Sequence, residues 1–68
     1  MRISARNQLE GKVIAITEGA VNAKVDVDLG EGKIITSIVS MEALKELELA
    51  EGSSVTTLIK ASSVLLMA

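Results

Sequence analysis

Hydrophobic and polar residues alternate most regularly between Val21 and Leu29. Every second position there is apolar, and the positions between carry amide, amine or carboxylate side chains. A period of two places the apolar side chains on one face of a strand and the polar ones on the other. We therefore predict a half-solvated antiparallel strand, with Val21, Ala23, Val25, Val27 and Leu29 facing the core and Asn22, Lys24, Asp26 and Asp28 facing solvent.

Four other segments have the character of strands. Leu9–Thr17 contains a β-branched run that ends at Glu18-Gly19, and Lys33–Val39 is rich in Ile and Thr. A short glycine-containing loop separates Lys33–Val39 from the alternating segment, which predicts a hairpin. Val55–Lys60 follows a Gly-Ser-Ser turn, and Val64–Met67 is predicted to form a short fifth strand.

The period of two breaks at Ser40, where the pattern becomes helical. Ser40 is a good N-cap residue, and Glu42 falls in the first turn, where a negative charge is favourable. Apolar residues then form one stripe at helical spacing: Ala43, Leu44 and Leu47. These features predict a helix of about two turns over residues 40–47.

The predicted order of elements is β-β-β-α-β-β. This order favours a mainly β fold, a five-stranded OB-like Greek-key barrel with one short helix between strands 3 and 4. The strand count also fits an SH3-like barrel. We find no linker, internal repeat or low-complexity segment, so residues 1–68 are expected to form a single domain.

The composition limits how this domain can be stabilised. Half of its 68 residues are hydrophobic (49%), but it has no cysteine, histidine, proline or aromatic residue. A disordered tail, a disulfide scaffold and a zinc finger are thereby excluded. A domain of this size buries only about 60% of its unfolded surface. We therefore expect a homo-oligomer that buries aliphatic side chains between subunits.

The charge and the apolar runs argue against nucleic-acid and membrane partners. Seven basic and nine acidic residues give a net charge of −2, and no aromatic side chain is present to stack on bases. Met1–Asn7 lacks the apolar region of a signal peptide. The longest apolar run, Val64–Ala68, is far shorter than the ~20 residues of a membrane-spanning helix. The expected location is the cytoplasm.

Few residues could perform catalysis. Without histidine or cysteine, the remaining candidate is a serine and lysine pair, Lys60 and Ser62, which would face the same way on a continuing strand. A lysine at a strand end beside a hydroxyl-rich turn is the better interpretation. We therefore do not expect an enzyme.

An acidic cluster at Asp26, Asp28 and Glu31 raises the possibility of a calcium loop. Such a loop needs oxygen ligands at its first, third and fifth positions and glycine at the sixth. Here glycine stands at the fifth position and Glu31 at the sixth. We interpret the cluster as a solvated strand face that also discourages edge aggregation.

Two polar segments could instead hold an oxyanion. Ser4–Gln8 and Lys60–Ser63 each join a cation to hydroxyl groups and turn backbone, the mixture of donors that a tetrahedral dianion requires. The start of the predicted helix at Ser40 would add N–H donors. Each feature has a plain alternative, because a solvated N-terminal segment and an ordinary helix cap look the same in sequence.

Three stretches of the chain resemble the molbindins, the small Mop-type molybdate-binding proteins. The most specific is the opening run Ile3-Ser4-Ala5-Arg6-Asn7-Gln8-Leu9-Glu10-Gly11-Lys12-Val13, and the others are Ile35–Ser40 and Leu58–Ser62. The resemblance spans essentially the whole chain. Its length suits a one-domain molbindin better than the regulators and transporter ATPases that carry the same module.

This resemblance implies an OB-like barrel assembled as a hexamer, a trimer of dimers, that holds molybdate or tungstate at subunit interfaces. The implied role is cytoplasmic molybdenum storage and homeostasis. The implied ligand donors are Ser4, Ala5, Arg6, Ser40, Lys60, Ala61 and Ser62. Some members carry a hydroxyl residue where this chain has Ala43, which implies one hydrogen bond fewer to the ligand. The alternatives are a self-assembly or interaction module without an oxyanion and, third, a phosphate- or nucleotide-binding regulator.

Overall fold

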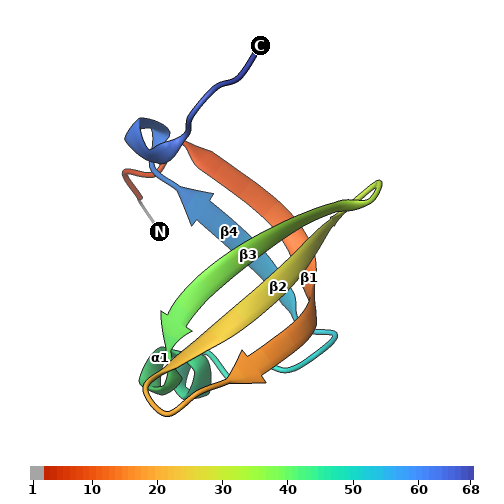
Figure 1. Cartoon of the computed structure of the whole chain (residues 1–68), viewed down its shortest axis with the longest axis vertical. Helices are drawn as coiled ribbons and strands as arrows, with labels where there is room; N and C mark the ends of the chain where they lie inside the picture. The colour runs from red at the N-terminus through yellow and green to blue at the C-terminus, as the bar shows by residue number, and fades with distance from the viewer. Residues whose placement is uncertain (1–2) are drawn as a thin grey trace.

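Four antiparallel strands form one curled sheet in the computed structural model, which describes residues 3–68 (Figure 1). Met1 and Arg2, which begin the segment considered as a signal peptide, lie outside the described residues. The elements are β1 (Asn7–Glu18), β2 (Asn22–Gly30), β3 (Lys33–Ser40), α1 (Met41–Glu46), β4 (Ser54–Ile59) and the 3₁₀ turn η1 (Ala61–Ser63).

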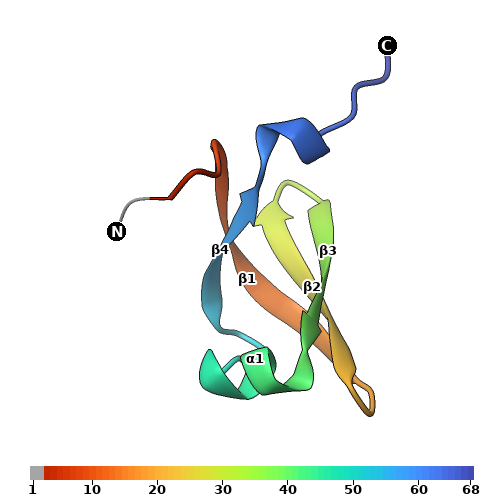
Figure 2. The same cartoon turned by 90° about the vertical axis from the view of Figure 1, so that its left-hand side faces the viewer.

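The strands lie in the order β3-β2-β1-β4. Two hairpins join β1, β2 and β3, and the connection through α1 returns the chain to place β4 beside β1. This is a Greek-key arrangement, as the sequence predicts. The sheet has two unpaired edges, β3 and β4, so the described strands form a curled sheet and not a closed ring (Figure 2).

The predicted fifth strand is wrong. After β4 the chain winds through η1, and Val64–Met67 has no strand partner. An apolar, β-prone sequence becomes a strand only where another strand is available to pair with it. Here the chain leads away from the sheet beyond η1 (Figure 2), so no such partner lies beside it within one copy.

Gly11 allows β1 to pair with two neighbouring strands, β4 and β2. The first half of β1 pairs with β4, from Asn7 to Lys12, and the second half pairs with β2. A Cβ atom on Gly11 would lie 2.6 Å from the carbonyl oxygen of Asp28 and 2.7 Å from a methyl carbon of Val27. Only glycine fits this close approach. The close contact and a register shift between residues 13 and 15 curl the strand.

The core is small and entirely apolar. Within residues 3–68, the buried side chains that form one cluster are Val13, Ala23, Val25, Val27 and Leu44. The alternating pattern is thus confirmed for Ala23, Val25 and Val27 of β2. Val21 is the exception, at 73% exposed, because it lies in the turn before β2.

The N-terminus of α1 matches its prediction. Ser40 has an extended backbone, and its Oγ accepts a hydrogen bond of 3.0 Å from the Ala43 N–H. Glu42 lies in the first turn. The predicted stripe is only partly right, because Leu44 is buried but Leu47 is 63% exposed. Met41 packs against the core instead.

The C-terminus of α1 is a Schellman motif. The Glu48 N–H donates to the Lys45 carbonyl at 3.0 Å, and the Leu49 N–H donates to the Leu44 carbonyl at 3.2 Å. Leu49 packs against the buried cluster that contains Leu44. Glu48 takes the left-handed conformation that this motif requires, with φ of 53°. No helix among residues 3–68 has the length and apolar character needed to cross a membrane.

Candidate functional site

The pairing of β1 with β4 brings the two predicted oxyanion-binding segments to one end of the sheet. Asn7 is the first residue of β1, and its partner Ile59 is the last residue of β4. Arg6 therefore directly precedes the paired position, and Lys60 directly follows it. The first turn of the described chain and η1 lie at the same end of the molecule (Figures 1 and 2). Two cations 54 positions apart in sequence become neighbours in the fold.

Two amide side chains strengthen this junction. Asn7 Nδ2 donates a hydrogen bond of 3.2 Å to the Ile59 carbonyl oxygen. Gln8 Nε2 lies 3.4 Å from the Ala5 carbonyl oxygen, a weaker contact that turns the N-terminal segment back toward β1. Sequence reasoning included both amides in a polar segment but gave neither a role. The sequence feature that could have indicated this role is an amide residue that follows a cation at the start of a strand.

The candidate donor residues differ in how far they are exposed to solvent. Ala5 is only 8% exposed, so its methyl group anchors the N-terminal segment to the protein. The flanking residues Ser4 and Arg6 are exposed, as are Lys60 and the first residues of η1. An anchored main chain with solvent-facing hydroxyl and guanidinium groups can meet an ion arriving from water.

The turn η1 supplies main-chain donors next to Lys60. Its hydrogen bonds run from the Ser63 N–H to the Lys60 carbonyl at 2.9 Å and from the Val64 N–H to the Ala61 carbonyl at 3.2 Å. The first N–H groups of a helical turn find no partner inside that turn, which leaves those of Ala61 and Ser62 as donors. The turn also means that Lys60 and Ser62 do not share a strand face, as a serine and lysine nucleophile pair would require.

Ser40 lies at the opposite end of the sheet. It pairs with Asn22, next to the position where Ala23 pairs with Glu18, the last residue of β1. Arg6 precedes the first residue of that 12-residue strand. At about 3.3 Å per residue, the separation is on the order of 30 Å. One copy of the chain therefore does not bring Ser40 together with Arg6 and Lys60.

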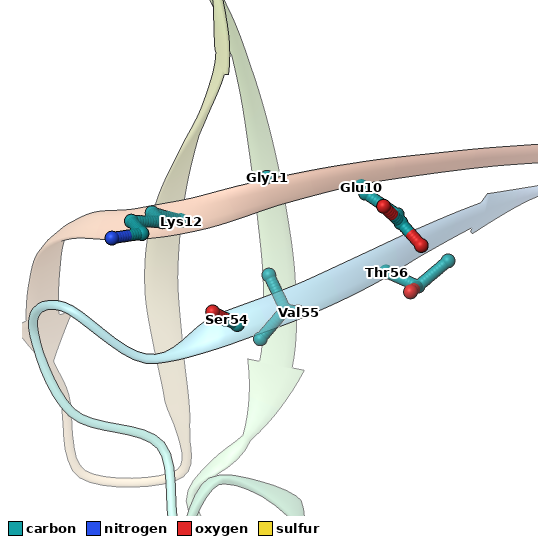
Figure 3. Close-up of a pocket in the computed structure, with 6 residues that line it drawn as sticks. All are labelled: Glu10, Gly11, Lys12, Ser54, Val55 and Thr56. Atoms are coloured by element: carbon teal, nitrogen blue, oxygen red, sulfur yellow. The ribbon is translucent and has the colours of Figure 1, made fainter.

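A hollow of about 460 Å³ lies on the β1–β4 pair, away from the predicted oxyanion donors. The Glu10 carboxylate and the Thr56 side chain lie together at one end of it, and the Lys12 ammonium group points away from them (Figure 3). Its other lining residues are Gly11, Ser54 and Val55. None of the predicted donors lines this hollow, so we do not assign the oxyanion to it.

Two carboxylates of the acidic cluster, those of Asp26 and Asp28, accept hydrogen bonds from neighbouring residues. Asp26 Oδ1 accepts a hydrogen bond of 2.7 Å from Thr36 Oγ1, and Asp28 Oδ1 accepts one of 2.7 Å from the Gly30 N–H. Across residues 3–68, no three acidic, histidine or cysteine side chains are grouped to hold a metal ion. These bonds support the interpretation of the cluster as a solvated strand face.

Known proteins resemble this chain in sequence and in overall fold. The model of the TOBE domain family matches residues 3–66. The probable molybdenum-pterin-binding protein of Haemophilus influenzae is 52% identical over 65 residues, which cover 96% of this chain and 94% of that protein. The solved molybdate-binding protein of Sporomusa ovata superposes with a TM-score of 0.94 at 34% identity and covers both chains completely.

A longer relative also matches in structure. The cytoplasmic molybdate-binding protein ModG, solved with molybdate bound, has a TM-score of 0.91 and 51% identity. The match covers 96% of this chain and 46% of ModG. Together with the family match and the near full-length identity to the Haemophilus protein, this confirms the resemblance seen in the sequence. The chain belongs to the TOBE domain family, among the small molybdenum-pterin-binding proteins of the molbindin type.

Proposed function

We propose that this chain, acting as a single molybdate-binding domain, binds molybdate or tungstate for cytoplasmic molybdenum storage and homeostasis. The observation that carries the proposal is the junction of Arg6 and Lys60 at one end of the β1–β4 pair. Two relatives are named as molybdate-binding proteins, and one was solved with molybdate in place. The resemblance implies donors in the segments that contain Arg6 and Lys60, and these segments lie at one end of the sheet.

The chemistry of the junction suits a tetrahedral dianion. Arg6 and Lys60 supply positive charge, and Ser4 and Ser62 supply hydroxyl groups. The main chain at Ala5 and Ala61 places further donors beside them. Charge-assisted hydrogen bonds of this kind are about twice as strong as neutral ones. The net charge of −2 tunes the approach of an anion, but local donors decide whether it is held.

The position of Ser40 leads us to place the ligand between two copies of the chain. Ser40 and the Arg6–Lys60 junction lie at opposite ends of one copy. They can contact the same ion only if one copy contributes the cations and a second copy contributes the helix start. We therefore propose a homo-oligomer with the ligand at its subunit interfaces, with the hexameric trimer of dimers as the expected form.

Selectivity against sulfate follows from size. Sulfate has the same charge and shape as molybdate, but its bonds to oxygen are shorter. A rigid set of donors positioned for the larger ion leaves some hydrogen bonds to sulfate stretched. Each poorly made bond in a desolvated site costs about 1–3 kcal/mol. We expect sulfate and phosphate to bind much more weakly than molybdate and tungstate.

A module that serves only self-assembly is the second candidate. It is favoured by the exposed large apolar side chains on the outer face of β3, Ile34 and Ile38, and beyond η1, Leu65 and Leu66. A phosphate- or nucleotide-binding regulator is a weaker third candidate. Both alternatives predict that purified protein takes up no molybdate.

Calorimetric titration of the purified protein with molybdate, tungstate, sulfate and phosphate tests the proposal. Saturable binding of molybdate and tungstate, at least tenfold tighter than sulfate, is the expected result. Metal analysis of protein purified from molybdate-fed cells gives a second reading. Absence of molybdate and tungstate binding would refute the function. Tighter binding of phosphate than of molybdate would favour the third candidate.

A further inference from the structure

The side-chain amide of Gln8 turns back along its own chain. Its Nε2 donates a hydrogen bond of 3.4 Å to the main-chain carbonyl oxygen of Ala5, although Gln8 itself is exposed. Successive side chains of a strand point to opposite faces, so Gln8 and Asn7 act from opposite sides of β1. The Asn7 amide joins β1 to the Ile59 carbonyl oxygen on β4, whereas the Gln8 amide holds the segment that precedes β1.

The peptide unit that joins Ala5 to Arg6 is held on both sides. Ala5 is only 8% exposed, and Asn7, the residue after Arg6, is paired with β4. A peptide unit between two held residues can still turn as one rigid plane, and its carbonyl and N–H groups point in opposite directions. The bond from Gln8 to the Ala5 carbonyl oxygen therefore also fixes the direction of the Arg6 N–H.

The direction of this peptide unit matters for an anion beside Arg6. An N–H group attracts an oxyanion and a carbonyl oxygen repels it, so turning the unit over exchanges a donor for a repulsive group. The Arg6 N–H donates no hydrogen bond to another group among residues 3–68, which leaves it available to a ligand.

We propose that Gln8 is a positioning residue of the oxyanion site, which holds the Arg6 N–H toward the ion and so favours molybdate and tungstate over sulfate. The inference rests on the proposed function for its ligand and deepens it by naming a residue that acts through the main chain. A donor held in one direction suits an ion of one size, whereas a donor that can turn adapts to a smaller ion. Loss of the Gln8 amide should therefore weaken the binding of molybdate more than that of sulfate.

Gln8→Met and Gln8→Lys separate the hydrogen bond from the size and charge of the side chain. Met has nearly the length of Gln but no N–H donor, whereas Lys keeps a donor that can reach the same carbonyl oxygen. The charge that Lys adds acts on both dianions alike. The ratio of the molybdate affinity to the sulfate affinity therefore reports the direction of the main-chain donor and not the added charge.

Lys12→Met is the matched control. Lys12 is exposed and lies further along the same face of β1 as Gln8, beside the hollow drawn in Figure 3. The substitution also replaces a long polar side chain with Met. It makes no change near the Ala5–Arg6 peptide unit.

Calorimetric titration with molybdate, with sulfate as a competitor, gives the affinity ratio for each variant. We expect Gln8→Met to bind molybdate roughly three- to tenfold more weakly than the wild type, with a ratio at least about threefold lower. Gln8→Lys and Lys12→Met should keep the wild-type ratio. Because Gln8 is exposed, Gln8→Met should unfold at the same denaturant concentration as the wild type, which a purely structural role would change.

Nuclear magnetic resonance of the ligand-free protein tests the positioning without an oxyanion. Relaxation of ¹⁵N gives the order parameter of the Arg6 N–H, which is about 0.85 for rigid backbone and below about 0.6 for flexible backbone. We expect this order parameter to fall in Gln8→Met and to keep its wild-type value in Gln8→Lys and Lys12→Met.

Two results would overturn the positioning role of Gln8. One is an order parameter of the Arg6 N–H that is the same in Gln8→Met and the wild type. The other is an affinity ratio that Gln8→Met leaves unchanged or that Lys12→Met lowers equally. If Gln8→Met loosens the Arg6 N–H but the wild type binds neither molybdate nor tungstate, the proposed function fails and the hold of Gln8 on this peptide unit stands, so the two failures are distinguishable.

Discussion

The side-chain amide of Asn7 donates a hydrogen bond to the carbonyl oxygen of Ile59 and so joins the residue after Arg6 to the residue before Lys60. The bond is 3.2 Å long and links positions 52 apart in sequence. The main chains of β1 and β4 also pair at this point. The two cations are therefore held near each other by the sheet and by one side chain, independently of any ligand.

Replacing Asn7 with alanine should weaken molybdate binding without unfolding the protein. A partly buried hydrogen bond contributes about 0.5–1.5 kcal/mol, and its loss frees the end of β4 beside Lys60. We expect the affinity for molybdate to fall by roughly three- to tenfold, since 1.4 kcal/mol corresponds to tenfold. Calorimetry measures this, with Lys24→Ala, on the solvated face of β2, as the control. Equal affinities in the two variants would remove the positioning role of Asn7.

Two substitutions of Ser40 separate its capping role from its proposed ligand role. Ser40→Ala removes the hydrogen bond to the Ala43 N–H and should lower the free energy of unfolding by about 0.5–2 kcal/mol. Ser40→Asp keeps a good cap but adds a negative charge where an oxyanion would bind. It should retain stability and lose molybdate affinity by more than about tenfold. An Asp variant that binds molybdate like the wild type would exclude Ser40 from the site.

Gly11→Ala should destabilise the fold strongly. The added methyl group would meet the Asp28 carbonyl oxygen at 2.6 Å and a Val27 methyl carbon at 2.7 Å, so β1 or β2 must shift. Overpacking of this kind costs about 1–3 kcal/mol. Thermal unfolding at a fixed protein concentration measures the loss, against the neighbouring exposed Glu10→Ala. Melting temperatures that agree for the two variants would show that the strands relax without cost.

Glu48→Gly should stabilise the protein. Glu48 has φ of 53° at the end of α1, a conformation that costs a residue with a Cβ atom roughly 1–2 kcal/mol and glycine far less. The same change at Glu46, inside the last helical turn, should destabilise by about 0.5–1 kcal/mol. Chemical denaturation of both variants gives the two free energies. A loss of stability in both would contradict the Schellman assignment.

Much of the fold could be predicted because local pattern and local environment coincide. The alternation along β2 places Ala23, Val25 and Val27 in the core, and Ser40 caps α1 as its residue type suggests. The observed bounds of these elements differ from the predicted bounds by one or two residues. Leu47 turned out exposed because the Schellman motif directs Leu49, and not Leu47, toward the core.

What the sequence could not predict depends mainly on the pairing between distant segments. A strand-like composition at Val64–Met67 says nothing about whether a partner strand lies beside it. Strand register likewise separates Ser40 from Arg6 and Lys60 by the length of β1 within one copy, which the list of donors implied by the resemblance does not reveal. Register also created the Arg6–Lys60 junction, which the sequence could only suggest from the similar chemistry of the two segments.

The most direct test of the central claim is a double-mutant cycle on Arg6 and Lys60, read by calorimetric titration with molybdate. Each alanine variant loses a charge-assisted hydrogen bond of about 1.5–3 kcal/mol, so affinity should fall roughly ten- to hundredfold. Because both groups would contact one ion, the double variant should depart from additivity. Lys24→Ala, on the solvated face of β2, is the control and should bind like the wild type. Each variant is first shown to keep the oligomeric state of the wild type. Unaltered molybdate affinity in both single variants would contradict the account.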